Sequence, residues 1–184
     1  MIETARLFLR EMRHSDAADL LEYQSNPDIV RYIPWPVGNA ETVQRHIDKM
    51  LANSKPLPVE EGEYLVLVWE LKESGKVIGQ SNISVQSKDN LRGEVGWVTH
   101  QDFQRQGFAY EASIAMLEFG FEKMGLHRIV AEMDTRVAGS AEVAKKLGMR
   151  KEAEFREVEF FKDEWCDMWL YAILKSEFEA QKRY

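Results

Sequence analysis

Cysteine is scarce in this sequence and long apolar runs are missing, and each absence excludes a class of protein. Cys166 is the single cysteine among 184 residues, so neither an internal disulfide nor a cysteine-based zinc site can form. No apolar run approaches the roughly 20 residues that span a bilayer. The first residues carry charges at Glu3, Arg6 and Arg10, where a signal peptide would have an unbroken apolar core. We therefore expect a cytoplasmic protein without a membrane segment.

Basic residues are in the minority. The chain has 24 Lys and Arg against 31 Asp and Glu, a formal net charge of −7. Nucleic-acid binding needs clustered cations for the phosphates, so this balance excludes a general nucleic-acid binder. Two interpretations remain open: the acidic surface keeps the protein soluble, or it favours a cationic partner.

Repeats, low-complexity stretches and Gly/Ser linkers are absent. The length suits one domain, and an apolar share of 45% excludes a disordered or collagen-like chain. We therefore expect residues 1–184 to form a single domain.

The hydrophobic pattern predicts a mixed α/β protein. Alternating stretches indicate strands, and apolar residues spaced three and four apart, such as Ile114, Leu117 and Phe121, indicate helices. A strand, a helix and a returning strand over 93–133 form a βαβ unit, which implies one parallel pair in an otherwise antiparallel sheet of about seven strands. The expected strands are 6–10, 64–71, 77–85, 93–99, 127–133, 151–161 and 165–174; the expected helices are 15–23 with Ser15 as N-cap, one that begins at Pro27, 40–53, 110–124 and 140–147.

A short glycine-containing loop lies between the strand at 93–99 and the helix that follows it. Its residues are Gln104, Arg105, Gln106, Gly107, Phe108 and Ala109. Unpaired amides at a helix start can bind a phosphate, Gly107 permits close backbone approach, and Arg105 can add a charged contact. Neither a Walker A motif nor GxGxxG is present, which excludes those nucleotide loops. The pattern alone also fits an ordinary turn.

These six residues match the acyl-CoA pyrophosphate loop, Q/R-x-x-G-x-G/A, of the GNAT superfamily of N-acyltransferases. The chain resembles that superfamily over nearly its whole length, and in particular its RimJ/RimL-type branch. The resemblance implies a single-domain GNAT fold with helices on both faces and a central parallel pair that splays apart. The further segments that carry it are TARL at 4–7, YIPWP at 32–36, EVGW at 94–97, GLHRI at 125–129, KLGMRKEA at 146–153 and DMWLY at 167–171.

The resemblance also implies a coenzyme site without metal. Acetyl-CoA would lay its pantetheine arm along Trp97, Val98 and Thr99 and its pyrophosphate on the amides of residues 104–109, where Tyr110 opens the helix. Adenine and ribose would lie near residues 134–145. Two positions depart from the family pattern. Val137 replaces the usual Asn of an Asn-x-x-Ser element, and Ala144 stands where many members carry a Tyr general acid.

Three residues are candidates for proton transfer. Ser140 matches the Ser of the Asn-x-x-Ser element, and it is either the acid beside the thiolate or a helix N-cap. Glu94 is the candidate base, and its alternative is a solvated strand carboxylate. His100 could relay a proton through water or lie at the surface. Glu132 and Asp134, at the end of the partner strand, are weaker candidates for the base.

Acceptor recognition is expected from residues 25–45 and 155–165. Tyr32, Trp35 and Trp165 are candidates for an aromatic wall against an alkyl or cationic group, with core packing as the alternative. Asp28, Glu157 and Glu159 are acidic candidates for a cationic acceptor, and Cys166 is expected to be inert.

The expected reaction is transfer of an acetyl group from acetyl-CoA to a primary amine by direct attack. RimJ/RimL-type enzymes acetylate protein N-termini, so the resemblance favours a protein α-amine, such as that of a ribosomal protein. An α-amine has an ordinary pKa near 7.7–8.0 and a lysine near 10.4, so an α-amine is easier to neutralise. The alternatives are a small amine or aminoglycoside-like metabolite, and a degenerate domain that binds CoA as a sensor. Members of the branch often dimerise, so the resemblance leaves a homodimer open, while the sequence itself does not determine the oligomeric state.

Overall fold

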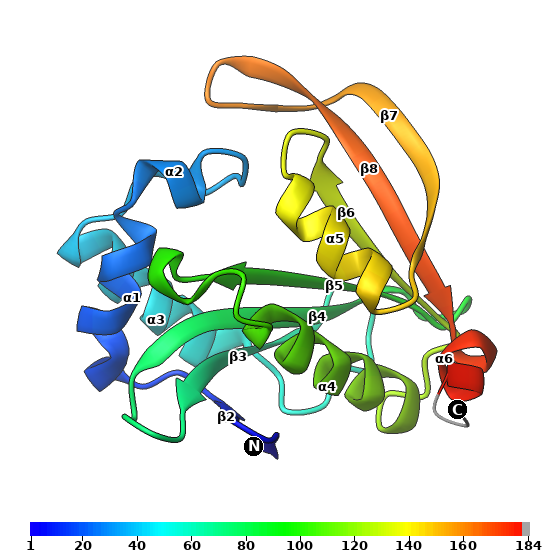
Figure 1. The fold of residues 1–184 in the computed structure, drawn as a ribbon, viewed down its shortest axis with the longest axis horizontal. Helices are drawn as coiled ribbons and strands as arrows, with labels where there is room; N and C mark the ends of the chain where they lie inside the picture. Colours follow the sequence, from blue (N-terminus) through cyan, green and yellow to red (C-terminus); the bar gives the residue numbers. More distant parts are fainter. Residues whose placement is uncertain (182–184) are drawn as a thin grey trace.

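A computed structural model describes residues 1–181 as a mixed sheet covered by helices on both faces (Figure 1). The sheet has the strand order β1-β2-β3-β4-β5-β6-β8-β7. The strands are β1 Ile2–Glu3, β2 Leu7–Arg10, β3 Tyr64–Leu71, β4 Val77–Ser87, β5 Arg92–Thr99, β6 Arg128–Asp134, β7 Arg150–Phe161 and β8 Glu164–Leu174. The α-helices are α1 Ala17–Gln24, α2 Pro27–Val30, α3 Ala40–Asn53, α4 Phe108–Glu122, α5 Ala138–Lys146 and α6 Lys175–Gln181, with 3-10 turns η1 His14–Asp16 and η2 Gln101–Phe103.

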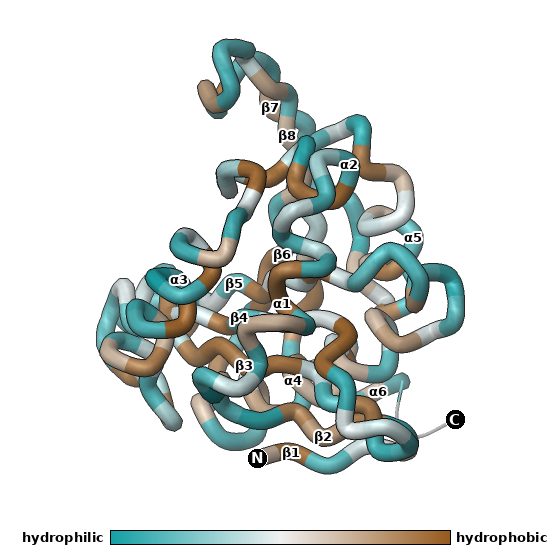
Figure 2. Tube along the Cα trace, turned by 90° about the vertical axis from the view of Figure 1, so that its left-hand side faces the viewer, coloured by the Kyte–Doolittle hydropathy of each residue, from teal (hydrophilic) through white to brown (hydrophobic). Residues whose placement is uncertain are grey.

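Alternation along β3 explains how the sheet buries both faces. Leu65, Leu67 and Trp69 belong to the core that includes the apolar residues of α4 and α5. Val66 and Val68, on the opposite face, pack in a second core with α1 and α3. Figure 2 shows the hydrophobic segments concentrated in the middle of the molecule, where strands and helices overlap.

The parallel pair β5 and β6 lies at the centre of the sheet and separates along its length. Pairing runs from Arg92↔Arg128 to Glu94↔Val130 and stops there. Beyond that point β5 stays paired with β4 as far as Thr99, and β6 stays paired with β8 as far as Asp134. The carboxyl halves of the two strands therefore leave a V-shaped gap between them. The mixed α/β fold and the splayed pair that the sequence predicted are confirmed.

Three details differ from the expectations. Ser15 is not a helix cap: a 3-10 turn begins at His14, and the buried Asp16 carboxylate binds the Arg13 amide and the Arg10 guanidinium instead. The sheet gains an eighth, two-residue strand, β1, that pairs with β2. The helix α6 was not expected because its residues are mostly polar, with Phe178 as its buried residue.

Candidate active site

The loop after β5 presents a row of backbone amides without protein partners. Arg105 has φ 60° and Gly107 has φ 85°, and Gly107 is the residue before the first turn of α4. Among the described residues, no hydrogen bond uses the amide of any residue from 105 to 110 as donor; the first helical bond runs from Glu111 to the Gly107 carbonyl. Free amides at the positive end of a helix form a site for an anion such as a pyrophosphate. The side chains of Gln104, Arg105 and Gln106 are exposed around it.

His100 fixes the start of this loop. Its ring is 1% exposed; Nδ1 accepts a hydrogen bond from the Asp102 amide at 3.2 Å, and Nε2 lies 3.0 Å from the Glu22 carboxylate of α1. The expectation of a surface histidine is therefore wrong. His100 also stands six positions beyond Glu94, roughly 20 Å along an extended strand, which is too far for a relay through one water. The geometry assigns His100 to the support of the loop.

Ser140 lies in the first turn of α5, on the same side of the sheet as α4. The N-cap of α5 is Val137, which makes no side-chain capping bond, so the N-cap interpretation of Ser140 is wrong. The Ser140 hydroxyl makes no hydrogen bond to another described residue and is only partly buried. Ala144 is fully buried in the core, so this helix supplies no tyrosine at that position. The hydroxyl of Ser140 can therefore donate to a ligand.

Glu94 lies on the opposite face, where the gap begins. Val95 and Trp97 face the core of α4, and Val98 faces that of α1 and α3, so the alternation places Glu94 on the α1–α3 side. The same argument places Glu132 of β6 on that side, since its neighbours Ala131 and Met133 pack in the α4–α5 core.

The surroundings of the Glu94 carboxyl raise its pKa. Gln86 of β4 donates a hydrogen bond to it at 2.7 Å. Burial, and then the negative charge of Glu132, raise the pKa of Glu94 to about 7, with a smaller contribution from Glu159 of the β7–β8 hairpin. A carboxyl with that pKa is half-ionised near neutral pH and can accept a proton there. Sequence patterns did not single out Gln86, because its contact depends on the β4–β5 register.

Asp134 and Cys166 are held by Arg136 and are not free for proton transfer. Arg136 donates to both oxygens of the buried Asp134 carboxylate at 2.8 and 2.6 Å and to the Cys166 sulfur at 3.2 Å. Burial alone would raise the pKa of Asp134, but the hydrogen bonds from Arg136 outweigh it and lower that pKa. Burial raises the pKa of the Cys166 thiol. Both side chains are parts of a structural ion cluster beside the gap.

Each of the three aromatic candidates for the acceptor wall packs against a different side chain. Tyr32 packs under the Arg136 guanidinium at 4.5 Å, and Trp35 packs against His46 of α3 at 5.4 Å. Trp165 is 59% exposed on the hairpin and packs against Phe160.

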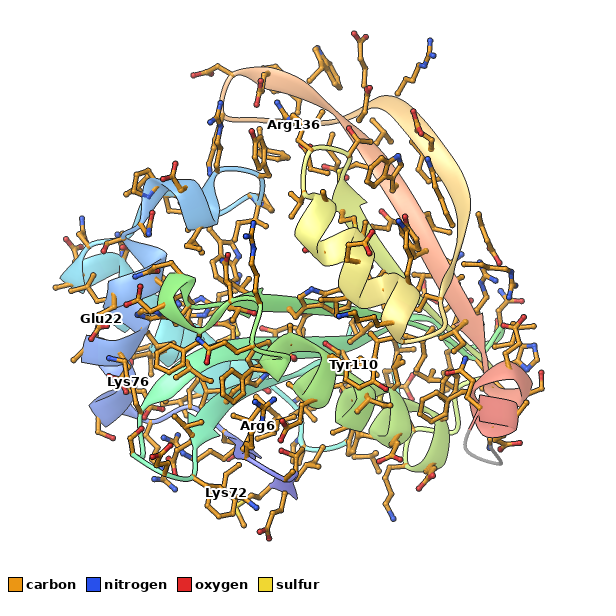
Figure 3. All side chains as sticks on the ribbon, in the orientation of Figure 1. Arg6, Glu22, Lys72, Lys76, Tyr110 and Arg136 are labelled. Atoms are coloured by element: carbon orange, nitrogen blue, oxygen red, sulfur yellow. The ribbon has the colours of Figure 1, made fainter. Side chains whose placement is uncertain are left out.

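The hairpin also reaches α2. Lys162, in the β7–β8 turn, donates to the Val30 and Arg31 carbonyls at the end of α2. Figure 3 shows Arg136 below the hairpin, between the end of β6 and β8. The α2 segment and the hairpin therefore bound the α1–α3 side of the gap, where the acidic candidates Asp28, Glu157 and Glu159 are all exposed.

Residues 6–150 match the acetyltransferase (GNAT) domain family. The chain belongs to that family. It is 33% identical to the uncharacterized N-acetyltransferase YnaD of Bacillus subtilis over 177 residues, which cover 96% of this chain and 98% of YnaD. The crystal structure of a GNAT-family acetyltransferase from Bacillus anthracis is 28% identical, with a TM-score of 0.84 over 95% of this chain and 98% of that one.

Two solved structures with lower identity share the fold. One is RimL, a ribosomal L7/L12 α-N-protein acetyltransferase in complex with coenzyme A, at 16% identity and a TM-score of 0.79 over 93% of this chain and 95% of that one. The other is spermidine N-acetyltransferase from Vibrio cholerae with CoA and spermine, at 17% identity and a TM-score of 0.78 over 95% of this chain and 99% of that one.

Membership of the GNAT family makes this chain an acyl-CoA-dependent N-acetyltransferase. The geometry fits that chemistry: the free amides at 105–110 suit the pyrophosphate of an acyl-CoA, and the pairing of β5 with β6 stops at Glu94, which leaves the carboxyl halves of the two strands apart. No group of His, Cys, Asp and Glu that could hold a metal ion occurs among residues 1–181. Within the same residues, no helix is both long and apolar enough to cross a bilayer.

Proposed function

We propose that this GNAT enzyme is of the RimJ/RimL type and transfers the acetyl group of acetyl-CoA to the α-amine of a protein N-terminus. The observation that carries the proposal is Glu94, a half-buried carboxyl with a pKa of about 7 at the point where the gap opens. A base of that pKa is matched to an amine whose own pKa is 7.7–8.0. A lysine amine would be roughly 3.5 kcal/mol harder to neutralise at pH 7.

In this proposal, acetyl-CoA and the acceptor bind on opposite faces of the sheet. Acetyl-CoA lies on the α4–α5 side, with its pyrophosphate on the amides of residues 105–110 and its pantetheine arm along Trp97, Val98 and Thr99. Gln104 of the predicted loop and Tyr110, in the first turn of α4, border the phosphates. The acceptor approaches from the α1–α3 side, past Tyr32, Trp35 and Trp165. This placement brings the thioester to the gap between an acid and a base.

Each reacting group has a named partner in this proposal. Glu94 takes a proton from the attacking amine as its nitrogen bonds to the thioester carbon. The carbon–sulfur bond then breaks, the Ser140 hydroxyl donates a hydrogen bond to the leaving thiolate, and water supplies the proton that converts the thiolate to the CoA thiol, while Glu94 returns its own proton to solvent. The amides of Ala138 and Gly139, which donate to no other described residue, stabilise the negative charge on the sulfur until then. The products are the acetylated amine and CoA.

A small polyamine is the second candidate acceptor. The negative charges of Glu132 and Glu159 both raise the pKa of Glu94, so the potential around Glu94 is negative. Such a potential complements a substrate with several positive charges, and one of the structural neighbours is a spermidine N-acetyltransferase. A domain that binds CoA without turnover is a third reading.

A thiol-release assay separates these candidates. Acetyl-CoA is offered with peptides that begin with Ser, Thr, Ala or Met, with spermidine, with an aminoglycoside, and with a lysine peptide whose N-terminus is blocked. We expect release with one or more free N-terminal peptides and none with the blocked peptide. Release with spermidine or the aminoglycoside alone would assign a small-amine acceptor. CoA binding without release from any amine would favour the sensor.

A further inference from the structure

The amino-terminal segment reaches the coenzyme loop through one side chain, Arg6. Its Nη1 donates to the Gln106 carbonyl at 3.0 Å, and its guanidinium lies 4.0 Å above the centre of the Phe108 ring. A Cβ placed on Gly107 would lie 3.4 Å from Arg6 Nη2, so the guanidinium is at contact distance from that residue too. Arg6, labelled in Figure 3, therefore contacts Gln106 and Phe108 and lies beside Gly107, about 100 residues away in sequence.

Glu111, in the first turn of α4, holds Arg6 in this place. Its carboxylate accepts hydrogen bonds from Arg6 Nε at 2.7 Å, from the Arg6 amide at 2.6 Å and from the Thr4 hydroxyl at 2.7 Å. The Glu111 side chain is mostly buried, whereas that of Arg6 is 45% exposed. A charged hydrogen bond of this geometry is stronger than a neutral one, and several together fix the rotamer of a long side chain.

The rings below the loop continue the support. Phe108 packs edge-on against Phe103 at 6.2 Å, and Phe103 packs edge-on against His100 at 5.4 Å. Arg6, Phe108, Phe103 and His100 therefore form a continuous row of contacts, with Phe103 in η2 and Phe108 at the start of α4. This row flanks the loop, whose amides are unpaired.

We propose that Arg6 is a positioning residue for coenzyme binding: with Glu111, it holds residues 106–108 so that their amides are arranged for the pyrophosphate before acetyl-CoA arrives. The proposal rests on the assignment of the loop to the pyrophosphate. Without Arg6 the loop must be ordered at the moment of binding, so part of the affinity for the phosphate end is lost. The chemistry at the thioester is unaffected, because Arg6 contacts no residue placed there.

The test compares Arg6→Ala with Lys72→Ala. Lys72 donates to the Thr4 carbonyl and to Glu3, so its removal loosens the same amino-terminal segment without touching the loop. Calorimetric titration with CoA should show a Kd about tenfold higher for Arg6→Ala, a change of ~1.4 kcal/mol, and little change for Lys72→Ala. The KM for acetyl-CoA should rise by a similar factor while kcat stays near the wild-type value.

A shortened donor distinguishes positioning from general damage. Acetyl-pantetheine lacks the pyrophosphate, so Arg6→Ala should use it as well as the wild type does. An unchanged CoA Kd in Arg6→Ala, or an equal loss with both donors, would overturn the proposal. Failure of the wild type itself to bind CoA would instead contradict the proposed function.

Discussion

At the residue scale, the raised pKa of Glu94 has two consequences: it suits the carboxyl to proton transfer, and it lowers the stability of the folded protein at neutral pH. A carboxyl whose pKa rises to about 7 in the folded protein binds its proton more tightly there than in the unfolded chain. The raised pKa of Glu94 therefore stabilises the folded protein below about pH 4.5, where the carboxyl is protonated in both states. This stabilisation is lost as the pH rises from about 4.5 to 7, and it stays lost above that range. Glutamine keeps the shape of the side chain and cannot ionise.

We expect Glu94→Gln to be more stable than the wild type above pH 7, by about 1–3 kcal/mol after allowance for partial solvation, and to match it near pH 4.5. Denaturant unfolding at several pH values measures the difference. Glu73→Gln, at an exposed position in the β3–β4 turn, serves as the control and should show no such trend. Equal stabilities for Glu94→Gln and wild type at pH 8 would mean that burial does not raise the pKa of Glu94.

Ser140 provides a second prediction at this scale. Since its hydroxyl makes no bond within the described protein, Ser140→Ala removes no structural contact. We expect kcat to fall by roughly 10²-fold, the lower end for a lost proton donor, with an unchanged melting temperature and an unchanged CoA Kd. A drop in melting temperature with normal kcat would assign Ser140 a structural role.

At the element scale, the strands and helices with a strong periodic pattern were predictable from sequence. The expected strand over 64–71 coincides with β3, and Pro27 is the first residue of α2, where the Asn26 side chain accepts from the Asp28 amide. Both depend on local alternation or on proline and capping chemistry, which a single stretch of sequence carries. The predicted start of α1 at Ser15 was wrong, because Asp16 is held by the Arg10 guanidinium and the Arg13 amide, contacts that helix periodicity does not indicate.

The candidate site was predictable to the same extent. Gly107, and the position of residues 104–109 between a predicted strand and a predicted helix, predict the loop from sequence. The contacts of Gln86 with Glu94 and of Arg6 with Gln106 were not visible, since each joins segments that only the folded sheet brings together. His100 was a candidate for proton transfer, with a surface position as the alternative, because a strand-end histidine gives no sign in sequence that it will be buried and will contact Glu22.

The loop itself supports a prediction about CoA binding. Gly107→Glu places a negative charge at the proposed pyrophosphate site and strains a residue with φ 85°. Gly75→Glu is the matched control: Gly75 has φ 73°, and no atom lies within 4 Å of its added Cβ. We expect calorimetry to detect no CoA binding for Gly107→Glu and near-normal binding for Gly75→Glu. Normal binding by both variants would remove the loop from the coenzyme site.

At the scale of the whole molecule, two distant parts of the chain meet over the acceptor side. Lys162 of the hairpin donates to carbonyls at the end of α2, and Arg136 packs on Tyr32. These contacts join the end of α2 to the β7–β8 turn and Tyr32 to the segment between β6 and α5, so we expect both to affect the approach of the acceptor.

Lys162→Met should loosen this bridge while it keeps the length of the side chain. We expect the KM for the acceptor to change at least threefold, and the KM for acetyl-CoA, which the proposed function places on the other face, to stay the same. Steady-state kinetics with one substrate varied at a time measures both values. Lys175→Met, in the first turn of α6 outside the bridge, is the control. An effect on acetyl-CoA alone would contradict the two-sided arrangement.

The central claim is that Glu94 accepts the proton of an amine that attacks through the gap between β5 and β6. Its most direct test is the pH dependence of kcat/KM for the acceptor, measured for wild type and Glu94→Gln with the same acceptor, so that the ionisation of the amine is common to both. We predict that kcat/KM of the wild type divided by kcat/KM of Glu94→Gln rises with pH through an inflection near 7. Above that pH, Glu94→Gln should be slower by roughly 10²–10⁴-fold. A ratio that stays constant with pH, or equal rates, would contradict the account.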